Sequence, residues 1–193
     1  MDGFLMSTGI VALAEIGDKT QLLSLVLAAR YRRPLPIILG ILVATLLNHA
    51  LASAVGAWLT TVLGPQVLRW GLGVSFLAMA VWMLIPDKLD DDDAPPTGRL
   101  GVFGATLIAF FLAEMGDKTQ VATVALAARY GEMAWIVAGT TLGMMIANVP
   151  AVLLGDRLSG RLPVRLVHAL AAILFAALGV TVLLSEQFGL SVG

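Results

Sequence analysis

Six long apolar runs alternate with short polar breaks along this chain. Each run has about the 20 residues that a helix needs to cross the hydrocarbon core of a bilayer. The runs cover residues 4–28, 35–62, 67–86, 100–128, 133–155 and 163–185. Glycine, proline and charged residues stand between them, as expected where helices end. The pattern therefore predicts an all-α membrane protein with six transmembrane helices.

The composition supports a membrane location. Of the 193 residues, 59% are hydrophobic and 13% are charged, whereas soluble domains are about half apolar and a quarter charged. The mean hydropathy is +0.92, so the bilayer is the first predicted partner. No basic patch suited to phosphates is present, which argues against a nucleic-acid partner. The chain has no cysteine, which excludes disulfides, thiol nucleophiles and thiolate metal sites.

The second half of the chain repeats the first at a shift of 99 residues. Without any gap, 13 of the 20 positions from 12 to 31 are identical to their shifted counterparts. The sequence thus predicts one three-helix repeat at 1–86 and another at 100–193. Between them, residues 87–99 hold four consecutive aspartates and two prolines, which predicts a solvated linker. An acidic loop that senses calcium or manganese is the alternative.

An odd number of spans in each repeat implies that the two repeats cross the membrane in opposite directions. The lysines and arginines outside the first and fourth runs test this arrangement. Eight fall on one side, namely Arg30, Arg32, Arg33, Lys88, Arg99, Arg157, Arg161 and Arg165, and only Arg69 and Arg129 fall on the other. The positive-inside rule places the eight, and the acidic linker, in the cytoplasm and both termini outside. Without a recognisable cleavable signal or transit peptide, we expect a multi-pass protein of a prokaryotic inner membrane.

Charged residues interrupt the first and fourth runs near their centres. They are Glu15, Asp18 and Lys19 in the first run, and Glu114, Asp117 and Lys118 in the fourth. A charge at the centre of a span costs about 2.5–3.5 kcal/mol on insertion scales, so these side chains should face one another or water. On a continuous helix, spacings of three and four place each set on one face. Gly17 and Gly116 permit close helix approach or a local break in the helix.

Inverted symmetry would bring the two sets together near the membrane midplane, in one oxygen-rich site. We expect Glu15, Asp18, Glu114 and Asp117 to bind metal. The predicted supporting residues are Lys19, Lys118, Thr20, Thr119, Gln21, Gln120, Ser24, Thr123, Asn48 and Asn148. Four acids against two lysines leave a formal charge of −2, which suits hard dications such as Ca²⁺, Mn²⁺ and Mg²⁺. A purely structural role, with each acid paired to a lysine, leaves this surplus unexplained.

Buried polar residues in the other spans have a second interpretation. Asn48 and His49 lie in the second run, and the 99-residue shift pairs His49 with Asn148 in the fifth. In membrane helices such residues more often join helices than bind ligands. His49 could still ligate Mn²⁺ or relay protons, and its role stays open at this point.

The duplicated motif Glu-x-Gly-Asp-Lys-Thr, at residues 15–20 and 114–119, resembles that of the Gdt-type membrane exchangers of Golgi, chloroplast and bacterial membranes. The resemblance covers nearly the whole chain, and both motif copies are complete. It implies transport of Mn²⁺ and Ca²⁺ in exchange for protons. It also implies that the functional acids are Glu15, Asp18, Glu114 and Asp117.

Together these observations predict a secondary transporter, not an enzyme, that exchanges Mn²⁺ or Ca²⁺ for protons and favours efflux. The transported ions would be its only cofactors. An amino-acid exporter and a passive cation channel are the alternatives. An intramembrane aspartyl protease fits poorly, because Glu15 and Glu114 stand where its motif requires glycine. The choice between the two metals, the proton stoichiometry and the oligomeric state stay open, although a fused repeat could work as a monomer.

Overall fold

The computed structural model describes residues 1–85, 101–154 and 164–184, and these residues form helices and no strand. The helices are α1 (Asp2–Glu15), α2 (Lys19–Tyr31), α3 (Pro34–Val62), α4 (Pro65–Trp82), α5 (Gly101–Glu114), α6 (Lys118–Tyr130), α7 (Met133–Leu154) and α8 (Val164–Leu184). Within the described residues, three helices are long and apolar enough to cross a membrane: α3, α7 and residues 165–184 of α8. The prediction of an all-helical protein is confirmed for the described residues, and these apolar helices are consistent with a membrane protein.

Four of the predicted runs correspond to single helices. They are the runs 35–62, 67–86, 133–155 and 163–185, which match α3, α4, α7 and α8 within a few residues. The largest difference is in α4, which ends at Trp82 and continues as a turn to Ile85. The predicted linker at 87–99 lies outside the described residues.

The other two runs each contain a break. The run 4–28 forms α1 and α2, and the run 100–128 forms α5 and α6. Gly17 and Gly116 lie in the breaks with φ angles of 83° and 78°, which are left-handed values that a right-handed helix cannot contain. The alternative of a local break at these glycines is therefore confirmed. The prediction of one continuous helical face across each motif is wrong.

The two halves of the chain are intertwined, and two of their contacts correspond to each other. Helix α1 packs on α7 of the other half, and α5 packs on α3. A Cβ atom added at Gly139 of α7 would clash with the Ser7 hydroxyl of α1, and one at Gly40 of α3 would clash with Thr106 of α5. The 99-residue shift converts one pair of positions into the other. Small residues thus let the halves approach closely at two equivalent places.

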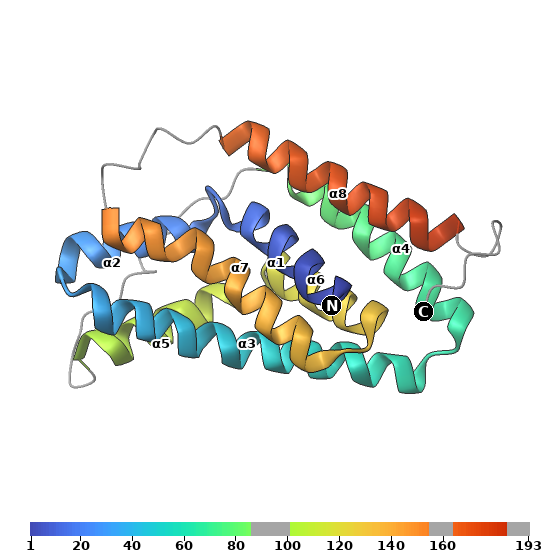
Figure 1. Cartoon of the computed structure of the whole chain (residues 1–193), viewed down its shortest axis with the longest axis horizontal. Coiled ribbons are helices and arrows are strands. Elements are labelled where there is room, and N and C mark those ends of the chain that lie inside the picture. The colour runs from blue at the N-terminus through green and yellow to red at the C-terminus, as the bar shows by residue number, and fades with distance from the viewer. Residues whose placement is uncertain (86–100, 155–163, 185–193) are drawn as a thin grey trace.

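Helices α4 and α8 form a separate pair on one side of this core (Figure 1). They pack along each other, with the rings of Phe76 and Phe175 6.3 Å apart. The pair rests mainly on α1 and α6. The 99-residue shift relates α1 to α5 and α2 to α6. The α4–α8 pair therefore covers the face formed by α1 and α6, and it leaves the equivalent face, formed by α5 and α2, largely uncovered. This is the main departure of the fold from the symmetry of its sequence.

Candidate metal site

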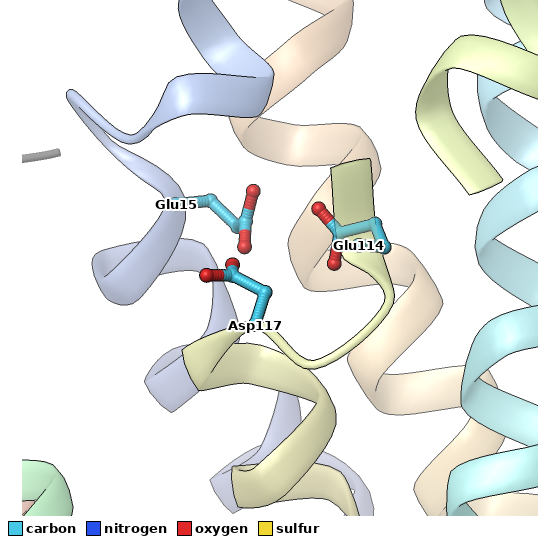
Figure 2. Close-up of side chains that lie close together, drawn as sticks. All are labelled: Glu15, Glu114 and Asp117. Carbon is cyan, nitrogen blue, oxygen red and sulfur yellow. The ribbon is translucent and has the colours of Figure 1, made fainter. Parts of the chain in front are cut away.

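Three carboxylates meet where α1 and α5 end and just before α6 begins. Glu15, Glu114 and Asp117 each offer one oxygen, and these oxygens lie within 4.8 Å of one another. Figure 2 shows the three side chains pointing toward a common space. At most 4% of each residue is exposed. Buried carboxylates this close repel one another strongly unless a cation or protons compensate them.

Threonine hydroxyls orient the two glutamates. Thr20 donates a hydrogen bond to Glu15 Oε2 at 2.5 Å, and Thr119 donates one to Glu114 Oε2 at 2.9 Å. The second oxygen of each glutamate, Oε1, has no hydrogen-bond partner within the described parts of the chain. Each side chain is thus held in place and keeps an oxygen available for a ligand.

The size of the cluster suits a hard dication. Oxygen ligands of Ca²⁺ lie about 2.3–2.6 Å from the ion, so two ligands on opposite sides are about 5 Å apart. The 4.8 Å within which the three oxygens lie matches that span. The set contains only carboxylates, which suit Ca²⁺, Mn²⁺ and Mg²⁺ better than softer metals.

Asp18 lies outside this cluster, and the lysines join the two halves. Lys118 Nζ lies 3.6 Å from Asp18 Oδ1, and Lys19 Nζ lies 3.7 Å from Asp117 Oδ1. Because the helix is unwound between Glu15 and the lysine four residues later, the two do not share a face. Each lysine instead pairs with the aspartate of the opposite motif, so the ion pairs are related by the 99-residue shift.

The first break, between α1 and α2, is covered by the α4–α8 pair. His168 of α8 donates a hydrogen bond from Nε2 to the Ile16 carbonyl oxygen at 2.7 Å. Lys118 Nζ donates to the carbonyl oxygen of Ile85, which follows α4, at 3.4 Å. The Lys118 and Asp18 side chains are 1% and 0% exposed. His168 was not among the predicted site residues; its signal in the sequence is its match with Arg69, a second polar residue at the equivalent place in α4.

The second break, between α5 and α6, is more exposed than the first. The Lys19 side chain is 26% exposed, and Met115, the counterpart of Ile16, is 56% exposed. The backbone N–H of Gly116 donates to Gln120 Oε1 at 2.7 Å in an exposed position. The α4–α8 pair therefore covers the first break, whereas the second break, between α5 and α6, is less covered by other helices.

The predicted glutamines brace the two breaks. Gln21 Oε1 accepts a hydrogen bond from the Gly17 N–H at 2.8 Å, as Gln120 does at Gly116. Gln21 Nε2 also donates to the Ala147 carbonyl oxygen of α7 at 3.0 Å. These side chains fix the unwound backbone of each motif.

Other predicted supporting residues join helices near the site. Ser24 donates to Asn148 Oδ1 at 2.7 Å, which links α2 to α7. Asn48 Nδ2 donates to the Phe111 carbonyl oxygen at 3.1 Å, which links α3 to α5. Thr123 donates to the backbone of its own helix. These hydrogen bonds agree with the expected role of joining helices for Asn48 and Asn148.

Comparison with known proteins places these features in a family. A Vibrio cholerae protein named "Putative manganese exporter" is 54% identical over 171 residues, which cover 88% of this chain and 84% of that protein. The "GDT1-like protein sll0615" of Synechocystis is 28% identical over 187 residues, with 86% and 89% coverage. The "GDT1-like protein 3" of Oryza sativa subsp. indica is 23% identical over 205 residues, with 93% and 73% coverage.

No solved structure matches the chain. The model of the family described as "Divalent cation/proton antiporter GDT1" matches residues 3–91 and 102–189. The family consists of transporters, so the prediction that the chain is not an enzyme is confirmed. The chain belongs to the GDT1 family of divalent cation/proton antiporters.

Proposed function

We propose that this protein exchanges Mn²⁺, Ca²⁺ or both for protons, and that the ion binds to Glu15, Asp18, Glu114 and Asp117. The convergence of three buried carboxylates within 4.8 Å is the observation that carries the proposal. Asp18 would join the site, or balance its charge, through the ion pair with Lys118. The other proposed partners are the bilayer and the transported ions, and one chain would suffice.

Manganese efflux is the favoured activity. Carboxylate oxygens accept both Mn²⁺ and Ca²⁺, and the Vibrio cholerae relative is named for manganese export. An amino-acid exporter is disfavoured because a substrate carboxylate would be repelled by the cluster. A passive channel is disfavoured because the site is sealed on the side that α4 and α8 cover.

The proposed membrane architecture has six spans in two inverted repeats, residues 1–86 and 100–193, joined by a cytoplasmic linker. The first and fourth spans are discontinuous, consisting of α1 with α2 and of α5 with α6. Broken helices at a central site are typical of inverted-repeat transporters. The corresponding contacts of α1 with α7 and α5 with α3 support the repeat. Both termini would lie outside the inner membrane of a prokaryote.

The uneven covering of the core suggests how access alternates. Helix α2 ends next to Arg30, Arg32 and Arg33, so the open side faces the cytoplasm in the proposed orientation. In the opposite state the α4–α8 pair would cover α2 and α5 instead. Lys19 would then approach Leu184 at the end of α8, as Lys118 approaches Ile85 now, because both pairs are related by the same shift. The ion would be released outside.

Cysteine labelling tests this asymmetry, since the chain contains no native cysteine. We expect a water-soluble thiol reagent applied from the cytoplasmic side to label Gln120→Cys at least about tenfold faster than Gln21→Cys. Gln21 is 8% exposed and bonded to α7, whereas Gln120 lies at the open break. The two sites correspond to each other, so each serves as the other's control. Equal rates from the cytoplasm would contradict the proposed access.

Ion uptake into inside-out membrane vesicles tests the function itself. Vesicles that contain the protein should take up Mn²⁺ or Ca²⁺ faster when their interior is made acidic, and a protonophore should remove the difference. Mg²⁺ and vesicles without the protein are the controls. Uptake that ignores the imposed pH gradient would reject the exchange mechanism.

A further inference from the structure

A stripe of buried polar residues on α3 lacks the hydrogen bonds that burial demands. The stripe is Thr45, Asn48, His49 and Ser53, with spacings that place all four on one helical face. Each is at most 1% exposed. Thr45 Oγ1, Asn48 Oδ1, Ser53 Oγ and both ring nitrogens of His49 have no hydrogen-bond partner in the structure as described. Leaving such groups unpaired costs about 1–3 kcal/mol each, so the stripe calls for a ligand or water.

Two hydroxyls of the stripe are not used within the helix. The buried hydroxyls of Thr123 and Thr140 each bond to a carbonyl oxygen of their own helix four residues back, whereas those of Thr106 and Thr141 lack a partner among the described residues, as in the stripe. Thr45 and Ser53 make no such bond. Their oxygens are therefore free to act as ligands beside the His49 imidazole.

The stripe lies beside the second break. Asn48 bonds to the Phe111 carbonyl oxygen, one turn before the end of α5. Gly56, two turns after His49 on the same face, packs so closely on α6 that an added Cβ would clash with the Val124 carbonyl oxygen. His49 therefore lies between these contacts on the part of α3 that packs on α5 and α6, outside the cluster of three carboxylates itself.

The other half of the molecule carries no such stripe. The shift pairs His49 with Asn148, whose Oδ1 accepts from Ser24 and whose Nδ2 donates to Met144. It pairs Thr45 and Ser53 with Met144 and Val152, which are apolar. The repeated fold thus forms in α7 with a satisfied asparagine at this place, so the fold of one repeat needs no histidine there.

We propose that His49 ligates the transported ion through a neutral ring nitrogen and so selects Mn²⁺ over Ca²⁺, with hydroxyl and amide oxygens of the same stripe as neighbours. The inference rests on the proposed function. Ca²⁺ takes oxygen ligands, whereas an imidazole nitrogen suits first-row transition-metal dications, among which Mn²⁺ also accepts carboxylates. A nitrogen ligand next to an all-oxygen cluster therefore penalises Ca²⁺ and favours Mn²⁺.

Transport selectivity provides the first test. In proteoliposomes, His49→Asn, which introduces the residue of the matched position 148, should lower the ratio of Mn²⁺ to Ca²⁺ initial rates about 10- to 100-fold. Ca²⁺ flux should persist. His49→Gln should behave alike, and Thr60→Ala, which removes an exposed hydroxyl at the far end of α3, should keep the wild-type ratio. An unchanged ratio in folded His49 variants would overturn the proposal.

Pulsed electron paramagnetic resonance of bound Mn²⁺ provides a test that does not depend on transport. The wild-type protein should show coupling of the ion to an imidazole ¹⁴N nucleus, and His168→Gln should retain it. His49→Asn should lose it. Absence of the coupling in the wild type, or its survival in His49→Asn, would exclude His49 as a ligand. Either outcome would leave the proposed exchange intact, since that stands or falls with gradient-driven uptake by the wild type.

Discussion

Replacing Asp117 by asparagine should lower the rate of cation transport at least about 100-fold without preventing membrane insertion. The substitution keeps the side-chain shape and removes one negative charge from a cluster whose members lie within 4.8 Å. Changes beside a metal already cost about 10–100-fold in affinity or activity, so loss of a direct ligand should cost no less. Glu15→Gln and Glu114→Gln should have effects of similar size. Asp18→Asn should too, because it removes the carboxylate that lies 3.6 Å from the buried Lys118 Nζ.

The measurement is initial Mn²⁺ uptake by proteoliposomes containing equal amounts of purified, monodisperse variants. Glu132→Gln is a suitable control, since its side chain is 49% exposed and pairs with the amino terminus. Near wild-type transport by Asp117→Asn would show that Asp117 is not part of the binding site. If all four variants were active, the carboxylate cluster would not be the binding site.

Much of the candidate site could be predicted from the sequence because the cost of intramembrane charge is independent of the details of the fold. Six charges near the centres of two apolar runs had to face one another or water, and the repeat made the two sets equivalent. Which lysine pairs with which aspartate could not be predicted in this way. The pairing depends on the unwound backbone at Gly17 and Gly116, where helical spacing no longer applies.

The fold, like the site, could be predicted only in part from the sequence. The ends of α3 and α7 follow from apolar run length and from the residues that end helices. A helix break at Gly17 and Gly116 was one of two predicted alternatives, but a single glycine in an apolar run does not reveal its φ angle. The placement of α4 and α8 over α1 and α6 could not follow from a symmetric repeat, because the same sequence pattern is equally compatible with the opposite face. The hydrogen bond from His168 to Ile16 results from that choice.

Proton movement should accompany metal transport because the empty site carries charge that cannot be enclosed. Four ionised acids and two charged lysines give the empty site a formal charge of −2, and one bound dication brings this charge to zero. The ion pairs use Asp18 and Asp117, whereas Glu15 and Glu114 have threonine hydroxyls as partners. These two glutamates are therefore the groups that we expect to take up protons when the ion leaves, at about two protons per ion, because buried unpaired charge is heavily penalised.

Metal-driven proton movement in proteoliposomes with an internal pH dye measures this coupling. Mn²⁺ added outside should make the interior more alkaline as protons leave in exchange, and an imposed acid interior should accelerate metal entry. Because glutamine resembles a protonated glutamate but cannot release a proton, Glu15→Gln and Glu114→Gln should each abolish the pH change together with metal flux. Wild-type metal flux with no pH change, and with no response to an imposed gradient, would show that the ion moves alone. The charge of the empty site would then have to be balanced by another cation before α4 and α8 could close over it.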